Sequence, residues 1–170
     1  MLRRLQAAGT LSALALALAL LAGCGGPDRP PPPPYSFDGL PVSGSLAYAR
    51  ASGFTACRAD TTEMRCRRSG VRLLGFGPFN AALDLNGYNG GGGFDELILW
   101  HDRDQNAFIQ IGSALERQGW RSCFTGEGNR GDQAIYMHPN GRVRLSMDLS
   151  YWGKRRLRVI PAWNRREPGC

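Results

Sequence analysis

The residues best suited to acid–base chemistry are a histidine and two carboxylates in the run His101-Asp102-Arg103-Asp104. An imidazole beside a carboxylate can move protons near neutral pH. Consecutive residues do not face one another, however, and this run comes directly before a segment with helical periodicity. Asp102 or Asp104 can cap that helix by accepting a hydrogen bond from a backbone N–H. Capping explains the two acids better than catalysis does, so we assign no catalytic residues.

A glycine-rich stretch at residues 87–93 has two possible chemical roles besides that of a loop. Phosphate-cradling loops open a helix and usually carry a lysine, whereas this stretch leads into a strand pattern at Phe94. Nearby oxygen ligands for calcium are available, but Tyr88 and Asn89 break the calcium-loop pattern. The oxygen ligands are Asp84, Asn86 and Asp95. We interpret the stretch as a flexible hairpin loop and expect neither a cofactor nor a metal.

Cys24 is the residue whose chemistry is most clearly indicated by its surroundings. Arg3 and Arg4 precede an apolar stretch at residues 11–22, which is too short to span a membrane and fits a signal peptide. The stretch ends in Leu21-Ala22-Gly23-Cys24, which resembles the lipobox of bacterial lipoproteins. The resemblance covers the leader alone.

The resemblance implies that Cys24 Sγ receives a diacylglyceryl group, that a signal peptidase cuts before Cys24, and that the new amine is acylated. More than one acyl chain gives stable attachment, since each buried methylene contributes roughly 0.8 kcal/mol. In such lipoproteins an Asp after the cysteine often retains the protein in the inner membrane, and here that position is Gly25. The expected location is the cell envelope, at the outer membrane facing the periplasm.

Proline dominates the segment that follows, residues 25–34. Such a run adopts extended polyproline II and reaches roughly 30 Å at about 3.1 Å per residue. We interpret it as a spacer, with docking into an aromatic groove as the alternative. The expected organisation is a signal peptide (1–23), a lipidated tether (24–34), a linker or edge segment (35–52) and one domain (53–170).

Four cysteines remain after Cys24 is lipidated, and an even number in an exported domain indicates disulfides. Three pairings are possible for Cys57, Cys66, Cys123 and Cys170. We favour Cys57–Cys66, which closes a short hairpin across a polar turn, together with Cys123–Cys170. Metal binding is the alternative, but the chain has no Cys-x-x-Cys, and His101 and His138 lack ligand spacing.

Strand patterns surround a single helical pattern in the domain. Apolar residues recur at helical spacing over residues 105–118, and Gly119 follows where a left-handed helix end is expected. Alternating or apolar runs predict strands at residues 71–75, 79–85, 94–100, 120–125, 133–138, 142–149 and 155–160. This order predicts an α+β fold, an antiparallel β-sheet with one helix packed on one face.

Positive charge is concentrated near the C-terminus. The chain has a formal charge of +7, and residues 142–166 hold eight basic side chains and one acid. If the last two predicted strands pair, Arg142, Arg144, Arg156 and Arg158 project to one side. This face is either a solvated edge or a docking site for an anion, namely a lipid phosphate, a lipopolysaccharide core, a peptidoglycan carboxylate or an acidic protein.

The functional expectation is therefore a non-enzymatic binding or structural module of the cell envelope. Its partners would be the membrane, through the lipid on Cys24, and an anionic envelope ligand or protein; no nucleic acid is expected. The alternative is an envelope enzyme or an enzyme inhibitor, with His101 or His138 involved.

Overall fold

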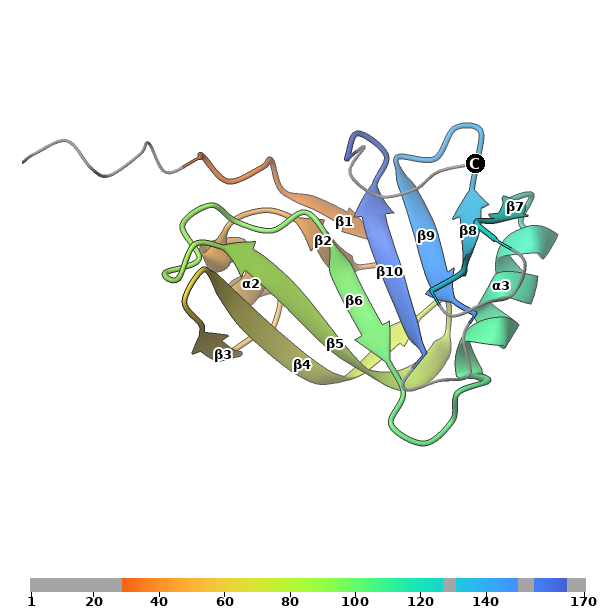
Figure 1. The fold of residues 1–170 in the computed structure, drawn as a ribbon, viewed down its shortest axis with the longest axis horizontal. Coiled ribbons are helices and arrows are strands. Elements are labelled where there is room, and N and C mark those ends of the chain that lie inside the picture. Colours follow the sequence, from red (N-terminus) through yellow and green to blue (C-terminus); the bar gives the residue numbers. More distant parts are fainter. Residues whose placement is uncertain (1–28, 127–130, 150–154, 165–170) are drawn as a thin grey trace, which may run out of the picture.

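The fold is built around one antiparallel sheet (Figure 1). A computed structural model describes residues 29–126, 131–149 and 155–164. Eight strands pair in the order β3-β4-β5-β6-β10-β9-β8-β7. Their bounds are β3 Ala56–Ala59, β4 Glu63–Leu73, β5 Phe76–Asn86, β6 Leu97–Trp100, β7 Arg121–Phe124, β8 Gln133–Met137, β9 Val143–Asp148 and β10 Arg156–Pro161.

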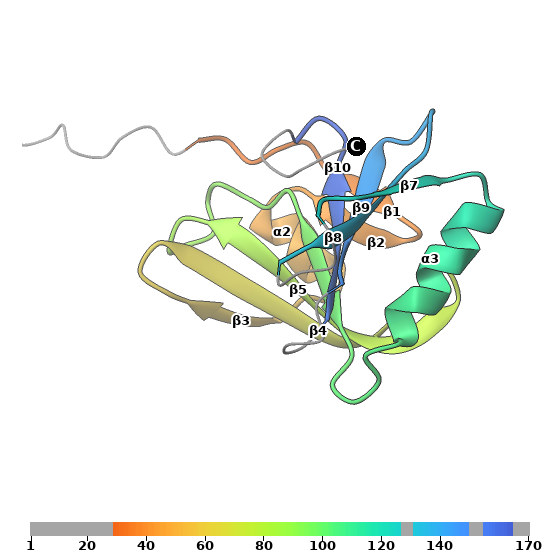
Figure 2. The same cartoon turned by 45° about the vertical axis from the view of Figure 1, so that its right-hand side comes forward.

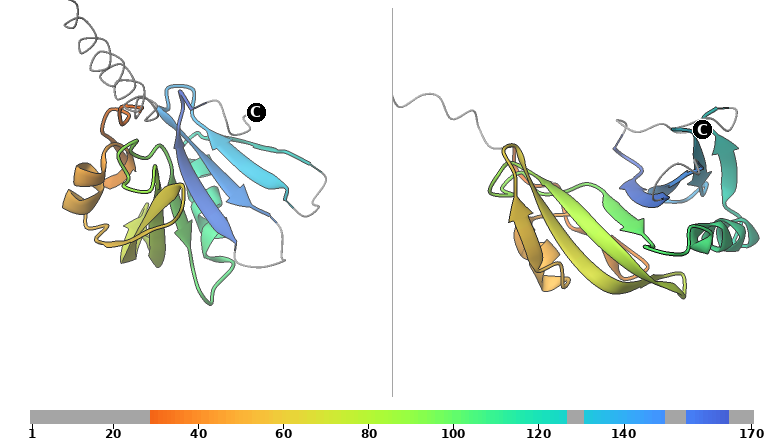
Figure 3. Two further views of the ribbon diagram at one scale, coloured as in Figure 1. Left: turned by 60° about the vertical axis from the view of Figure 1, so that its left-hand side comes forward. Right: turned by 60° about the horizontal axis from the view of Figure 1, so that its bottom comes forward.

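Strands β4 and β5 form a long hairpin that dominates one half of the sheet. Leu74 and Gly75 turn the chain, and both have positive φ, at 51° and 82°. Two consecutive positive φ angles match the right-handed twist of the strands that they join. The sheet is strongly twisted, so β3–β5 and β8–β10 run in different directions (Figures 2 and 3).

Two helices occur in the described residues, α2 at Leu46–Ala51 and α3 at Ala107–Arg117. Helix α2 begins after Ser45, whose hydroxyl accepts a hydrogen bond from the Tyr48 N–H. Helix α3 lies within the segment predicted to be helical, and Gly119 has the expected positive φ of 84°. Its cap differs from the prediction, because the Asp104 carboxylate accepts from the N–H of Asn106, the residue before the helix.

The core lies on the sheet face that α2 and α3 contact. Phe108 of α3 stacks on Phe79 of β5 with ring centroids 4.8 Å apart. Gly112 allows α3 to approach β8, because a Cβ there would lie 2.3 Å from the Tyr136 hydroxyl oxygen. The alternate apolar residues of β9 and β10 are buried, namely Val143, Leu145, Met147, Leu157 and Val159.

Residues 35–52 also contribute to this core. Strands β1 (Tyr35–Phe37) and β2 (Leu40–Ser43) form a two-stranded antiparallel sheet. Leu40, Val42 and Ala49 are each at most 5% exposed. The segment interpreted from the sequence as a linker or edge therefore packs with the domain.

The fold class is an antiparallel sheet with few helices, as the sequence predicted in outline. The finer prediction of a single helix packed on one face is not confirmed, because α2 is present within the described residues as well. The short apolar stretch of α2, with only Ala49 buried, gives too little periodicity to be recognised as a helix.

Candidate functional site

A groove of about 420 Å³ crosses the sheet face that points away from α2 and α3. Its size lies within the range of small-molecule sites. The lining comes from four adjacent strands and the segment after β6. It consists of Arg65, Arg67, Arg68, Ser69, Asn80, Ala81, Ala82, Ile98, Trp100, Asp102 and Arg156.

Strand register brings these residues together. Alternate residues of a strand face the same side, and residues that are paired across strands are neighbours. One row across the sheet pairs Arg67 with Ala82, Ala82 with Ile98, and Ile98 with Arg158. The next row consists of Ser69, Asn80, Trp100 and Arg156. Strands that are distant in sequence thus build one continuous surface.

The floor of the groove is apolar and its walls are polar. Ala82 is 2% exposed, while Ile98 and Trp100 are half-buried. The Asn80 side-chain amide donates a 2.7 Å hydrogen bond to the Asp102 carboxylate, so the amide is held in one orientation. The Trp100 ring thus has a polar amide on one side and the Arg156 position on the other.

Two of the guanidinium groups at the groove are free to bind a ligand. Arg67 and Arg156 are exposed, and neither has an ion-pair partner among the described residues. Arg65 instead forms a bidentate pair with Asp84, at 2.5 and 2.6 Å. The hydrogen bond from Arg65 to Asp84 raises the pKa of the Arg65 guanidinium above its ordinary value. The Asp84 carboxylate also offsets much of the positive charge of Arg65.

The four arginines predicted to share one exposed face have different surroundings in the structure. Arg156 lines the groove, while Arg158 beside it donates to Gln133 Oε1 and lies 3.7 Å from Glu96 Oε1. Arg144 is on the same face but only 5% exposed, so its predicted exposure is wrong.

Arg142 is also misplaced by the prediction. It precedes β9 at a bend, where the strand alternation does not apply. Its guanidinium carbon lies 4.7 Å from the centroid of the Tyr35 ring, away from Arg156. The β9–β10 pairing on which the prediction depended is present, and the anion-binding role of these arginines stays a prediction.

Sequence reasoning missed Arg65, Arg67 and Trp100. The signal for β4 was available, because Met64 and Cys66 alternate with Arg65 and Arg67 in the manner of a half-buried strand. The dense basic residues, with Ser69 and Gly70 after them, obscured that pattern.

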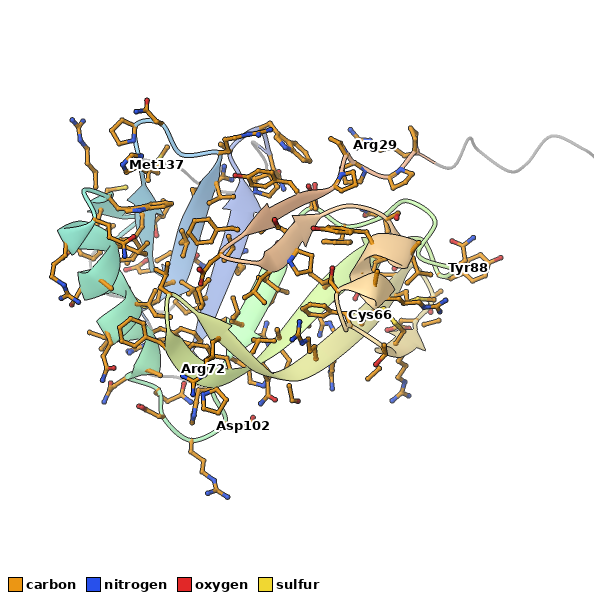
Figure 4. The ribbon with its side chains drawn as sticks, turned by 180° about the vertical axis from the view of Figure 1, so that it is seen from behind. Arg29, Cys66, Arg72, Tyr88, Asp102 and Met137 are labelled. Carbon is orange, nitrogen blue, oxygen red and sulfur yellow. A yellow bond between two sulfur atoms is a disulfide. The ribbon has the colours of Figure 1, made fainter. Side chains whose placement is uncertain are left out.

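The predicted Cys57–Cys66 disulfide is confirmed, with the two residues directly opposite on β3 and β4. Figure 4 shows Cys66 on the side of the sheet near α2. Cys123 is also disulfide-bonded. Cys170, its predicted partner, lies outside the described residues, so that pairing stays a prediction. Cys24 lies outside them as well.

Both histidines take part in turns of the backbone. His101 Nδ1 accepts hydrogen bonds from the N–H groups of Arg103 and Asp104, at 3.2 and 2.7 Å. His138 Nδ1 accepts one from the Asn140 N–H at 3.3 Å. The described residues contain no cluster of three or more His, Cys, Asp or Glu side chains that would suit a metal. No helix within the described ranges is long and apolar enough to cross a membrane.

The chemistry of the groove is that of a basic, partly aromatic surface. Comparisons with protein-family models, with curated proteins and with solved structures found no match.

Proposed function

We propose that the protein is a lipid-anchored component of the bacterial cell envelope that binds an anionic saccharide in the groove without transforming it. The observation that carries this proposal is the placement of two guanidinium groups, those of Arg67 and Arg156, on either side of the Trp100 and Ile98 floor, with no ion-pair partner among the described residues. The anion-docking role expected of the C-terminal hairpin thus moves to a surface that this hairpin shares with β4, β5 and β6.

The chemistry of the lining favours an acidic sugar. A guanidinium group presents a planar fork that matches a carboxylate or a phosphate. The faces of aromatic rings offer apolar contact area to a sugar ring, while the Asn80 amide and the Ser69 hydroxyl are hydrogen-bonding groups of the kind that sugar hydroxyls require. Arg67 and Arg156 stand three strand spacings apart across the sheet and two residues apart along the strands, which gives about 16 Å at the usual 4.8 Å and 3.3 Å spacings. A ligand longer than one sugar unit can therefore meet both charges.

Binding rather than catalysis is favoured by the state of the titratable groups near the groove. Its described lining holds no histidine or cysteine. The neighbouring carboxylates of Asp84 and Asp102 are held by Arg65 and Asn80. A general base must be free to take a proton from its substrate, and these groups are already engaged.

The envelope location is supported by two features of the chain. The leader with Cys24 provides the expected lipid anchor at the outer membrane, facing the periplasm. The Cys57–Cys66 disulfide is a type of bond that persists in oxidising compartments such as the periplasm.

Calorimetric titration of the detergent-purified protein tests the binding site. One titrant is a soluble peptidoglycan fragment, which carries carboxylates, and another is a phosphorylated lipopolysaccharide core oligosaccharide. A neutral oligosaccharide of similar length is the control ligand. We expect binding of at least one acidic titrant, and which of the two binds identifies the source of the ligand.

Variants of the groove connect that binding to the proposed residues. A hydrogen bond to a charged group contributes about 1.5–3 kcal/mol, so Arg67→Ala or Arg156→Ala should each weaken binding by about tenfold or more. Arg117→Ala removes the same charge from the exposed last turn of α3 and should leave the affinity unchanged. An equal loss of affinity in all three variants would contradict binding in the groove. Equal binding of the neutral and the acidic oligosaccharides would contradict it as well.

A further inference from the structure

The last part of the proline-rich tether is bound to the domain. Ser43 of β2 is fully buried, and its hydroxyl donates a 2.8 Å hydrogen bond to the Pro33 carbonyl oxygen. The glycine-rich loop makes room for the prolines at Gly93, where a Cβ would lie 2.6 Å from Pro31 Cβ. Gly93 has a φ of 65° and is buried. The chain is thus held against the domain from about Pro31 onward.

This contact shortens the free part of the tether. Cys24 and Pro31 are seven residues apart, and an extended chain spans at most about 3.6 Å per residue. A lipid on Cys24 would therefore hold Pro31 within about 25 Å of the membrane surface. That clearance is shorter than the roughly 30 Å that a fully extended spacer would give.

Two exposed aromatic side chains lie at the end of the domain where the described part of the tether begins. Trp163 is 53% exposed and lines a hollow of about 580 Å³ together with Arg29 and Pro32. Tyr88, at the tip of the glycine-rich loop, is 66% exposed. Figure 4 shows Tyr88 pointing outward at the end of the molecule toward which Arg29 also lies.

The described charged side chains that line this hollow offset each other. Arg29 lines the hollow, but the Asp95 carboxylate lines it too. These two side chains therefore contribute little net attraction to anionic lipid, and the aromatic rings are the groups of this surface best suited to contact a bilayer. Trp and Tyr are enriched at membrane–water interfaces because their rings are apolar and carry a polar atom.

We propose that this end of the domain rests on the membrane interface, with Trp163 and Tyr88 among the lipid headgroups. The inference depends on the lipid anchor of the proposed function, which brings the bilayer within reach. The strand faces that line the groove point toward the viewer in Figure 1, while the described part of the tether, residues 29–34, runs along the upper edge. Resting on the interface thus leaves the groove open sideways, along the membrane plane.

Tryptophan quenching in proteoliposomes tests the proposal with the intact lipidated protein. Nitroxide groups are placed on the lipid headgroup in one preparation and deep in the acyl chain in another. We expect the headgroup nitroxide to quench more emission than the deep one does, and we expect the Trp163→Phe variant to lose that difference. Phe124→Ala removes another exposed ring, on β7, and should retain it. The measurement is made in zwitterionic vesicles and again with phosphatidylglycerol added, and we expect the headgroup quenching in both, because the aromatic contact does not require anionic lipid.

Three results would overturn the inference. Emission that is insensitive to the headgroup nitroxide shows that the ring stays in water. Quenching that persists in Trp163→Phe assigns the contact to another tryptophan, and quenching that requires anionic lipid replaces the aromatic contact by charge attraction.

Mass spectrometry of the same sample separates these results from failure of the anchor. A lipidated Cys24 without quenching contradicts this inference alone, whereas a missing lipid contradicts the envelope anchor as well.

Discussion

The Cys57–Cys66 disulfide gives a prediction whose size can be worked from the structure. The bond joins residues that are 9 apart in sequence and directly opposite in the β3–β4 ribbon. The loss of loop-closure entropy in the unfolded chain then corresponds to about 2.6 kcal/mol at 25 °C. Truncating the buried Cys66 side chain adds a cavity cost of about 1 kcal/mol or less. We expect Cys57→Ala/Cys66→Ala to lower the free energy of unfolding by about 3 kcal/mol.

The assay is urea unfolding followed by tryptophan emission, with both proteins in the same detergent. Thermal unfolding gives a second measurement. For a domain of about 135 residues the unfolding entropy is about 0.28 kcal/mol/K, so a loss of 3 kcal/mol corresponds to a fall in Tm of roughly 10 °C. Thr55→Ala, an exposed change just before the same ribbon, should stay within about 0.5 kcal/mol of the parent protein.

The disulfide also supports the groove. Cys66 lies between Arg65 and Arg67 on β4, so a looser ribbon should weaken binding of the acidic saccharide as well as stability. A loss of stability below about 1 kcal/mol, with an unchanged denaturant dependence, would refute the chain-entropy reasoning. It would mean that the ribbon is held in place without the bond.

Three further predictions concern single contacts. A double-mutant cycle on Arg65→Ala and Asp84→Ala should give a coupling of about 0.5–1 kcal/mol in urea unfolding, because the pair is bidentate but half-exposed. Gly112→Ala should lower the free energy of unfolding by about 1–2 kcal/mol although alanine is the better helix former, because the new Cβ meets the Tyr136 hydroxyl. Adding Tyr136→Phe should recover part of that loss. A Gly112→Ala protein that is more stable than the parent would contradict the packing of α3 on β8. Burial raises the pKa of the Tyr136 phenol, so the unfolded chain loses this proton at a lower pH than the folded chain does. The free energy of unfolding should therefore be retained below about pH 10 and fall as the pH rises through the folded-state pKa. The Tyr136→Phe variant, which lacks this proton, should show a shallower fall.

Local patterns in the sequence account for the elements with clean periodicity. Val143, Leu145 and Met147 alternate with polar residues, and they are buried on β9 as expected. The α3 segment and the short Cys57–Cys66 bridge were predictable for the same reason, since each depends on residues close together in sequence.

The groove could not be predicted in this way, because it depends on pairing between distant strands. Trp100 of β6 and Arg156 of β10 are opposite only because these two strands pair. Arg67 joins them through β5, which stands between β4 and β6. Alternation along a strand indicates which residues share a face, but it does not indicate which strand lies beside it.

Tertiary surroundings also decide how exposed a polar residue is. Arg144 alternates outward on β9 as predicted, yet it is 5% exposed. Ser146, on the same face, is fully buried and donates a hydrogen bond to Gln133 Oε1 of β8. Alternation assigns a side chain to a face of the sheet, while burial depends on everything that packs against that face.

The central claim is that an acidic saccharide binds between Arg67 and Arg156 over the Trp100 ring. Its most direct test is NMR of the isotopically labelled protein during titration with the acidic oligosaccharide that binds. We predict that the Trp100 indole N–H and the Arg67 and Arg156 guanidinium signals shift together and saturate at one equivalent. Saturable binding that leaves these three signals unchanged would contradict the account.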